Sequence, residues 1–417
     1  MTRRIRPYLV LLRSNSAFRR VYAAQLISFG GDWFAQVALL GMALELSGSP
    51  IVASLVLVLQ TGGYALIAPF GGTLADRIDR KRLMVAADLA RVPICLGFLL
   101  THSEDTLWIA LACTALLSSF GAIFEPASSA ALPNLVDDEE LSTANVLLGS
   151  AWGVMLAVGA ALGGLVAATL GRDAAFVIDG LSFALSAALM IGVTRPFQKA
   201  RPVLAPGEHQ PSLLGSIRPV IRFARHSRFV SSLLLTKTLF GVGTGVIVLL
   251  AVFGGQVFNG GDVGIGVLFA ARGLGALIGP FAAKAIFGTS DRGLLVGISV
   301  SIVGVVIAYG LFPLAPTIVI AAVLVFAAHL GSGAQWMLST YGLQRHTPDA
   351  IRGRVFSFDY ALVTLAIAFS NIVAGILAQA LTPETAVWAM VTMLAIAGCA
   401  WLLFRAPARR HASRAAT

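Results

Sequence analysis

Twelve long apolar segments, separated by short polar connections, dominate this chain. Each is close to the length of about 20 residues that an α-helix needs to cross the hydrocarbon of a bilayer. The segments lie at 21–45, 51–75, 83–101, 106–131, 144–168, 173–194, 229–253, 263–287, 293–312, 315–343, 355–380 and 385–404. Only 12% of the residues are charged and the mean hydropathy is +0.84, so water is not the solvent for this surface. Because no segment alternates apolar and polar residues as a membrane barrel would, the sequence predicts an all-α integral membrane protein with twelve transmembrane helices.

The positions of the basic residues predict how the chain is oriented. Lysines and arginines gather in the N-terminal arm, after residue 75, between residues 195 and 228, and in the C-terminal tail. In a scheme of twelve helices these clusters fall on one side of the membrane, and only Arg172 falls in a loop on the other side. The positive-inside rule therefore places both termini in the cytoplasm. Because the cations lie between apolar segments and not along one exposed face, the net charge of +10 does not indicate nucleic-acid binding.

The two halves of the chain resemble each other. When the sequence is aligned with itself at an offset of 211 residues, several landmarks coincide without gaps: Pro69-Phe70 with Pro280-Phe281, Leu132 with Leu343, and Gly164 with Gly375. These matches favour a parallel duplication related by an axis along the membrane normal. We therefore expect a six-helix bundle with a basic arm at 1–194, a cytoplasmic linker at 195–228, and a second bundle with a basic tail at 229–417. A short surface helix is expected in the linker, near 213–226.

The most specific motif lies between the second and third apolar segments. It reads Gly71-Gly72-Thr73-Leu74-Ala75-Asp76-Arg77-Ile78-Asp79-Arg80-Lys81-Arg82-Leu83. Its spacing, G-x-L-A-D-R-x-x-R-K-R, resembles the signature loop between helices 2 and 3 of the major facilitator superfamily. The resemblance implies a cytoplasmic gate, in which Gly72 allows close packing and Asp76 caps a helix start or meets a cation. Arg77 and Arg80 are assigned to the same gate, and the loop's cations are expected to contact anionic lipids; a loop that only sets orientation is the alternative.

The fifth segment contains a second gating motif, Gly159-Ala160-Ala161-Leu162-Gly163-Gly164. It resembles the G-P-x-x-G-G pattern of the antiporter branch of the superfamily, with alanine in place of the proline. Small residues on one face let this helix press against a partner and seal a cavity, so Gly159, Gly163 and Gly164 are assigned to the gate. Packing with no role in transport is the alternative. Asp88 and Arg91, three residues apart in the third segment, can pair and are also assigned to gate structure.

Further stretches resemble the macrolide-efflux and enterobactin-export permeases of the superfamily. They are Gly31-Asp32, Phe124-Glu125-Pro126-Ala127, Leu132-Pro133-Asn134-Leu135-Val136, Ala144-Asn145, Asp179-Gly180-Leu181-Ser182-Phe183 and Arg352-Gly353-Arg354-Val355. The resemblance covers nearly the whole chain. It implies the major facilitator fold of two parallel-repeat six-helix bundles, a place in the bacterial inner membrane, and efflux driven by proton entry. It leaves the substrate open.

Three acidic residues lie inside apolar segments of the first half: Asp32, Glu125 and Asp179. Asp32, near the middle of the first segment, is the leading candidate for proton coupling, because an ionised carboxylate is costly in hydrocarbon. A carboxyl group that can be either protonated or ionised at this position can take up a proton from outside and release it inside. Glu125 and Asp179 are candidates for a second proton site. For each of the three, a structural carboxyl group bonded to a neighbouring helix is the alternative.

The substrate site is expected between the halves, near the bilayer midplane. The residues assigned to substrate binding are Asp32, Gln36, Arg272 and Trp336. Arg272 lies near the middle of its segment, so it should face a cavity or a carboxylate and not lipid. Lys237 lies closer to the cytoplasmic end and is expected to snorkel toward water, while His329 is expected to be a buried, hydrogen-bonded histidine.

These observations predict a proton-coupled secondary active transporter that exports an amphipathic organic compound, such as a drug, a macrolide-like or a siderophore-like molecule, by alternating access. Its partners are then the substrate, protons and membrane lipids, and we expect a monomer. A lysophospholipid flippase or a nutrient symporter is the alternative within transport, and a non-transporting membrane sensor or scaffold is the alternative outside it. The sequence contains no nucleophile–base set, metal-ligand cluster or phosphate loop, so no enzymatic activity, cofactor or metal is predicted.

Overall fold

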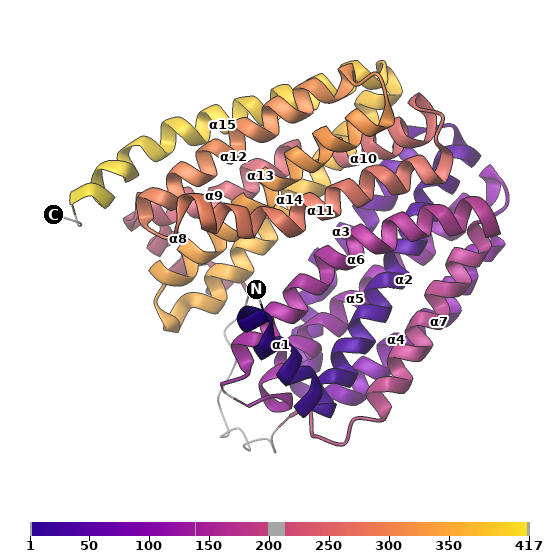
Figure 1. Cartoon of the computed structure of the whole chain (residues 1–417), viewed down its shortest axis with the longest axis horizontal. Coiled ribbons are helices and arrows are strands. Elements are labelled where there is room, and N and C mark those ends of the chain that lie inside the picture. The colour runs from indigo at the N-terminus through magenta and orange to yellow at the C-terminus, as the bar shows by residue number, and fades with distance from the viewer. Residues whose placement is uncertain (1, 138, 199–212, 415–417) are drawn as a thin grey trace. The chain divides into compact units, whose positions relative to one another are not determined.

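The computed structural model of the chain describes residues 2–137, 139–198 and 213–414, and the regular secondary structure in these ranges is entirely helical (Figure 1). Eleven described helices are long and apolar enough to cross a membrane, and a shorter apolar stretch, Pro50–Tyr64, begins another long helix. The helices follow the twelve apolar segments, with ends that differ by several residues. The prediction of an all-α membrane protein is confirmed.

The helices are numbered in chain order (Figure 1). Those of the first half are α1 (Thr2–Ser14), α2 (Ser16–Ser47), α3 (Pro50–Arg77), α4 (Arg80–Gly97), α5 (Leu107–Leu135), α6 (Leu141–Leu170) and α7 (Arg172–Ile191). Those that follow are α8 (Leu213–His226), α9 (Arg228–Gly243), α10 (Val246–Val252), α11 (Gly261–Phe287), α12 (Asp291–Leu311), α13 (Ile318–His346), α14 (Asp349–Ala380) and α15 (Pro383–Arg414). Short 3-10 or π turns, η1 to η4, lie at Phe98–Leu100, Glu104–Thr106, Phe253–Val257 and Phe312–Leu314.

The helix boundaries and helix pairings repeat at the offset found in the sequence. Shifting α5 by 211 residues gives the bounds of α13. In the first half α2 packs against α6 and α7, as α9 packs against α14 and α15 in the second. Likewise α4 packs against α5 and α7, as α12 packs against α13 and α15. A packing pattern shared by two halves of one chain is the expected product of a parallel duplication.

The chain divides into two compact units. Unit 1 comprises residues 1–202 and 251–270, and unit 2 comprises residues 203–250 and 271–417. The buried core of unit 1 includes Val21, Met84, Ala87, Phe124, Ala131 and Met190. The buried core of unit 2 includes Leu233, Leu294, Ile298, Leu338 and Trp401. The division into 1–194, 195–228 and 229–417 concerns the repeat in the sequence and stays a prediction.

The basic N-terminal arm forms helix α1, which the sequence analysis did not predict. Asn15 separates α1 from α2 and caps α2, because its Oδ1 accepts a hydrogen bond from the Phe18 backbone nitrogen at 2.9 Å. Its Nδ2 donates to the Leu135 carbonyl oxygen, also at 2.9 Å. One asparagine therefore starts the first long helix and ties its N-terminus to the end of α5.

The seventh predicted segment is not one continuous helix, as the sequence analysis expected. Helix α9 ends at Gly243, and α10 begins at Val246 and continues into a π turn. The Ser370 hydroxyl donates to the Val242 carbonyl oxygen at 2.6 Å and accepts from the Gly245 nitrogen at 2.8 Å. A side chain inserted into the backbone ladder in this way is a common cause of a helix break. Three glycines at 241, 243 and 245 are a signal for a break in the sequence, but Ser370 could not be found as its partner because it comes from α14.

Candidate functional site

Asp32 lies near the middle of α2, the longest of the first-half helices, and its side chain is exposed. Gly31, which precedes it, and Gln36, one turn further along the helix, are both buried. A charged carboxyl group in the centre of a membrane-spanning helix costs free energy unless other polar groups pair with it. The polar groups around Asp32 therefore decide what the site can do.

Asp179, on α7, lies close to the α2 backbone. Its side chain is 1% exposed, and a Cβ atom placed on Gly31 would lie 2.6 Å from its Oδ1. The Cys95 thiol donates to Asp179 Oδ2 over 3.3 Å, whereas no described residue donates a hydrogen bond to Oδ1. Asp179 and Asp32 interact electrostatically, so unit 1 holds two interacting carboxyl groups, one exposed and one buried.

Arg91, on α4, is the cation shared by the acidic groups of this site. Its Nη1 binds Asp88 Oδ1 at 3.2 Å, which confirms that the two residues pair as their spacing predicted. Ser186 donates to the other oxygen of Asp88 at 2.6 Å. The guanidinium carbon of Arg91 lies 5.2 Å from the ring centre of Phe124 and 4.9 Å from that of Phe183. The hydrogen-bonded ion pair with Asp88 and two aromatic faces thus fix the position of Arg91.

Four carboxyl groups interact electrostatically with this one guanidinium, and we call them, together with it, the acid cluster: Asp32, Asp88, Glu125, Asp179 and Arg91. Glu125 is half-buried on α5. The structure therefore brings together the three acids predicted for proton coupling and the Asp88–Arg91 pair predicted for the gate. A cluster with more carboxyl groups than cations has the composition needed to take up and release protons.

The residues assigned to substrate binding are divided between the units. Asp32 and Gln36 belong to unit 1, where the Gln60 side chain donates to Gln36 Oε1. Arg272 and Trp336 belong to unit 2. Arg272 is half-buried, and it interacts electrostatically with two buried side chains of unit 2, Tyr309 and His329. That it faces a cavity or a carboxylate stays a prediction.

Two of the buried side chains near Arg272 form a hydrogen-bonded network. The Tyr309 hydroxyl lies 2.7 Å from His329 Nε2, and the Ser332 hydroxyl lies 2.9 Å from His329 Nδ1. His329 is 4% exposed. The prediction of a buried histidine with its hydrogen bonds satisfied is confirmed.

The prediction that Lys237 snorkels toward water is wrong. Its side chain does not reach toward water but forms an ion pair with Asp359 of α14, and both residues are buried, with 4% and 2% of their surface exposed. Lys237 Nζ also lies 4.8 Å from the ring centre of Trp336, whose own surface is 41% exposed. Asp359 was not predicted as a functional residue, because a single acid in an apolar run gives no indication of its partner.

The first two residues of α4, both cations of the charged motif, bind backbone carbonyl oxygens of neighbouring segments. Arg80 Nη1 donates to the Ala130 carbonyl oxygen at 2.7 Å, and Lys81 Nζ donates to the carbonyl oxygens of Ile191 and Val193 at 2.8 and 2.7 Å. Ile191 ends α7, so Lys81 binds at a helix C-terminus, where the helix leaves carbonyl oxygens unpaired. These contacts give Arg80 and Lys81 structural roles within unit 1.

The prediction that Asp76 caps a helix start does not hold for α4. Asp79, not Asp76, caps α4, since its Oδ1 accepts from the Arg82 nitrogen at 2.9 Å, whereas the backbone of Asp76 lies in the last turns of α3. The Asp76 side chain and the surroundings of Gly72 lie outside the described residues, and Arg77 is exposed. Close packing is seen at the neighbouring Gly71, where a Cβ would overlap the carbonyl oxygen of Ala122.

The three glycines of the α6 motif lie in close helix contacts. A Cβ on Gly159 would lie 2.9 Å from the Trp33 Cβ, and one on Gly163 would lie 2.7 Å from the Phe34 Cα, both on α2. A Cβ on Gly164 would lie 2.5 Å from the carbonyl oxygen of Asp262 in the first turn of α11. Backbones can approach this closely only where no side chain intervenes. Their part in a gate stays a prediction.

Arg172 forms ion pairs that the sequence analysis did not anticipate. Its Nε lies 2.9 Å from Asp262 Oδ2, and its Nη2 lies 2.7 Å from Glu45 Oε2. Arg172 therefore joins the start of α7 to the end of α2 and the start of α11, all within unit 1. The signal available in the sequence was that Arg172 is the one cation predicted on the extracytoplasmic side.

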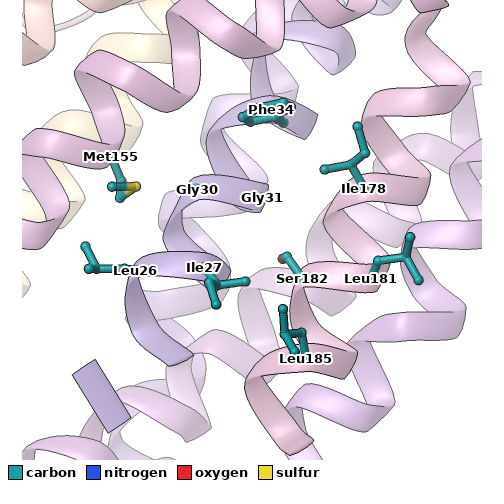
Figure 2. Close-up of a pocket in the computed structure, with 10 residues that line it drawn as sticks. All are labelled: Leu26, Ile27, Gly30, Gly31, Phe34, Met155, Ile178, Leu181, Ser182 and Leu185. Atoms are coloured by element: carbon teal, nitrogen blue, oxygen red, sulfur yellow. The ribbon is translucent and has the colours of Figure 1, made fainter. Parts of the chain in front are cut away.

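A pocket of about 460 Å³ lies between α2, α6 and α7 (Figure 2). Its lining residues are Leu26, Ile27, Gly30, Gly31, Phe34, Met155, Ile178, Leu181, Ser182 and Leu185. Figure 2 shows Met155 on one side of α2 and the α7 side chains on the other. Asp32 does not line this pocket. Among the residues whose side chains are described, no group of three or more His, Cys, Asp or Glu residues is arranged to hold a metal ion.

Membrane-length helices in repeated pairings, with charged groups gathered inside them, define the class of polytopic membrane transporters. The chain belongs to the transmembrane secretion effector family of the major facilitator superfamily, whose family model matches residues 11–417. The superfamily membership implied by the loop and α6 motifs is thereby confirmed.

Relatives in this family are named as exporters. The chain is 27% identical to BacE, a proposed bacilysin exporter of Bacillus subtilis (strain 168), over 88% of this chain and 89% of BacE. It is 26% identical to macrolide efflux protein A of Streptococcus pyogenes, over 87% and 89% of the two chains. It is 28% identical to the enterobactin exporter EntS of Shigella boydii serotype 18, over 96% and 95%.

The fold matches solved structures of transporters. A bacterial homologue of the human lysosomal transporter Spinster, in an inward-facing and occupied conformation, aligns with a TM-score of 0.74 at 14% identity, covering 94% of this chain and 97% of that chain. A bacterial homologue of the iron transporter ferroportin aligns with a TM-score of 0.71 at 16% identity, covering 94% and 98%. At these identities the likeness concerns the fold alone, and it confirms the major facilitator fold.

Proposed function

We propose that this protein exports an amphipathic organic compound from a bacterial cell in exchange for protons, by alternating access of a central substrate site. Relatives named for the export of bacilysin, macrolides and enterobactin support an organic cargo and the outward direction. The observation that carries the proton coupling is the acid cluster, in which Arg91 pairs with Asp88 and interacts electrostatically with the exposed Asp32, the buried Asp179 and Glu125.

Asp32 is the entry point for the proton in this mechanism, because it is the exposed member of the acid cluster. Protonation of Asp32 removes one negative charge beside Asp179 and so reduces the repulsion between them. It also leaves Arg91 more strongly bound to Asp88. A proton taken up on one side and released on the other moves with the membrane potential, which supplies about 2.3 kcal/mol per charge for each 100 mV.

The substrate contacts that we propose are Asp32 and Gln36 in unit 1, and Arg272 and Trp336 in unit 2. A cationic or hydroxylated group of the cargo competes with the proton for Asp32, so that proton and cargo occupy the site at different times. Competition of this kind is the simplest physical basis for antiport, because each ligand lowers the affinity for the other. We also propose that both termini lie in the cytoplasm and that the protein is a monomer.

Inverted membrane vesicles that contain the protein test this proposal. The vesicles are energised, a dye reports the pH gradient, and a panel of drug-like, macrolide and siderophore compounds is added one at a time. A cargo should dissipate part of the gradient in wild-type vesicles and none of it with Asp32→Asn.

The matched control is Asp105→Asn, the same substitution at an exposed position of η2, which should behave like wild type. If the cargo dissipated the pH gradient in Asp32→Asn vesicles as fully as in wild-type vesicles, Asp32 would be excluded from proton coupling. Cargo uptake that proceeds without any change of the pH gradient in wild type would exclude proton antiport.

A further inference from the structure

Trp336 is an exposed tryptophan on the side of α13 that faces away from lipid. It is 41% exposed, although it lies two turns beyond the 4% exposed His329 and on the same face, about 20° away around the helix. Ile320 and Val323, which are 44% and 60% exposed, lie about 160° and 140° away from Trp336 around the same helix. Large apolar side chains that remain exposed on a membrane-spanning helix are in contact with lipid tails. The exposed part of Trp336 therefore lies on the opposite side of α13 from the lipid.

One face of the Trp336 ring is covered from within unit 2. Lys237 Nζ lies over this face, 4.8 Å from the ring centre, and Lys237 is itself only 4% exposed. Asp359, which is 2% exposed, binds the same ammonium group and holds it in place. Since the covering pair is buried, the exposed surface of the indole lies on its other face and along its edge.

The indole N–H of Trp336 is available to a ligand. Trp388 has the same exposure of 41%, yet its Nε1 donates to the Gly310 carbonyl oxygen at 3.0 Å. No described residue accepts a hydrogen bond from Trp336 Nε1. The N–H of a tryptophan inside a protein usually finds an acceptor. Trp336 is thus held from one side, with its other face and its donor left for an occupant.

The cation behind the ring determines which groups can stack on the exposed face. The face of an indole carries negative charge density, which ordinarily attracts a cation. Lys237 uses this attraction from the buried side, and its ammonium group would repel a second cation on the exposed side. An uncharged aromatic ring does not meet this repulsion. The reduced negative charge on the exposed face also favours the stacking of two ring faces.

We propose that the exposed face of Trp336 binds a planar, uncharged aromatic ring of the cargo, and that the buried pair of Lys237 and Asp359 makes this position select against cationic rings. An oxygen atom beside the cargo's ring accepts a hydrogen bond from Trp336 Nε1. The inference names the chemical class of the group that the proposed exporter binds in unit 2, and it rests on that function for its meaning in the cell. Binding itself requires no proton gradient, so the two proposals fail in different experiments.

Three amphiphiles of nearly equal size test the site on the full-length protein in nanodiscs. They carry a naphthyl ring, its saturated decahydronaphthyl counterpart or an N-methylquinolinium ring, each joined through an ether oxygen to the same tetraethylene glycol tail. Equilibrium dialysis, with empty nanodiscs to correct for partition into lipid, gives each dissociation constant. Wild type should bind the naphthyl compound about fivefold more tightly than the decahydronaphthyl compound, the value expected for one aromatic stack.

Substitutions of Trp336 locate this preference. Trp336→Leu should abolish it, and Trp336→Phe should keep most of it, because a phenyl ring still stacks. The matched control is Trp388→Leu, at an equally exposed position of α15, which should bind both compounds like wild type. No binding of the naphthyl compound by wild type, equal binding of the naphthyl and decahydronaphthyl compounds, or an unchanged preference in Trp336→Leu would each overturn the proposal.

The double variant Lys237→Gln/Asp359→Asn tests the selection by charge. Its affinity for the quinolinium compound, divided by its affinity for the naphthyl compound, should exceed the wild-type ratio at least about fivefold, because an indole face without an ammonium group behind it attracts a cation. The variant removes one positive and one negative charge, and attractions that it shares with wild type, such as that of Asp32, cancel in the comparison. A ratio equal to that of wild type, or a lower one, would overturn the selection by charge.

Discussion

Arg172 binds the carboxyl group of Asp262 through two hydrogen bonds, from Nε to Oδ2 at 2.9 Å and from Nη2 to Oδ1 at 3.3 Å. The carboxyl group is nearly buried, with 8% of its side chain exposed, against 23% for Arg172. The glycine at position 41 leaves room for it, because a Cβ there would overlap Asp262 Oδ1. Bidentate pairs of this geometry are among the stronger ion pairs in proteins. Glu45, which is 69% exposed, binds the outer side of the same guanidinium.

The first prediction concerns the stability of this pair. Arg172→Gln or Asp262→Asn should each lower the free energy of unfolding by about 1–3 kcal/mol, because each leaves the other charge without its partner. The double variant should lose less than the sum of the two single variants. Thermal unfolding of the purified protein in detergent measures all four proteins of this cycle. Additive losses would show that the two residues do not stabilise each other.

The second prediction compares two glycines on the same helix. Gly164→Ala would place a Cβ 2.5 Å from the Asp262 carbonyl oxygen, whereas a Cβ at Gly149 would meet nothing within 4 Å. Gly164→Ala should therefore destabilise the protein by about 1–3 kcal/mol through overpacking. Gly149→Ala should be neutral or stabilise it by up to about 1 kcal/mol through helix propensity. The melting temperatures of both variants, compared with that of the wild type, test this prediction. Equal changes in melting temperature would mean that α6 and the start of α11 do not pack closely in the membrane.

The helices could be predicted from the sequence because their signal is local. Apolar runs of membrane length, bounded by charges, determine where each helix lies, and the offset of 211 residues anticipated the repeated pairings. The Asp88–Arg91 pair was equally accessible, because residues three apart share one face of a helix. The side chain that causes the break between Gly243 and Val246 was not accessible, because it is a serine 125 residues away from Gly245.

The candidate site was only partly predictable for the same reason. Acids inside apolar segments stand out one by one, so Asp32, Glu125 and Asp179 could be selected, but nothing in the sequence says that Arg91 connects them. Arg172 finds its partner Asp262 at a separation of 90 residues, and Lys237 finds Asp359 at a separation of 122. Pairings at such distances depend on how the helices pack, which a single sequence does not record.

The third prediction concerns Asp79 as the cap of α4. Its Oδ1 accepts from the Arg82 nitrogen at 2.9 Å, so Asp79→Ala leaves a helix N-terminus without its acceptor. The loss should be about 1 kcal/mol, and Asp79→Asn or Asp79→Ser should retain most of the stability, because both side chains can cap a helix. Denaturation of the three variants in mild detergent would show this order. Equal losses for all three would mean that the charge, and not the hydrogen bond, is what matters.

The last prediction concerns the buried pair of Lys237 and Asp359, which lies within unit 2 beneath the indole of Trp336. Taking two charges out of water costs about as much as their attraction returns, so the pair as a whole should add little to stability. Removal of one partner is different, because it leaves a single charge buried at 5% exposure or less. Lys237→Gln and Asp359→Asn should each cost about 3–5 kcal/mol and reduce the yield of folded protein.

The double variant Lys237→Gln/Asp359→Asn separates a structural role from a role in transport. It should recover most of the stability lost by the single variants, because two neutral groups of similar size then replace the ion pair. Yield from the membrane and the midpoint of thermal unfolding measure this recovery, and Glu104→Gln, an exposed carboxyl group in η2, is the control that should not change either. A double variant as unstable as the single variants would mean that the charges hold unit 2 together. Recovered stability with lost cargo transport would instead show that the ion pair works in the transport cycle, most directly by holding the exposed ring of Trp336 in place.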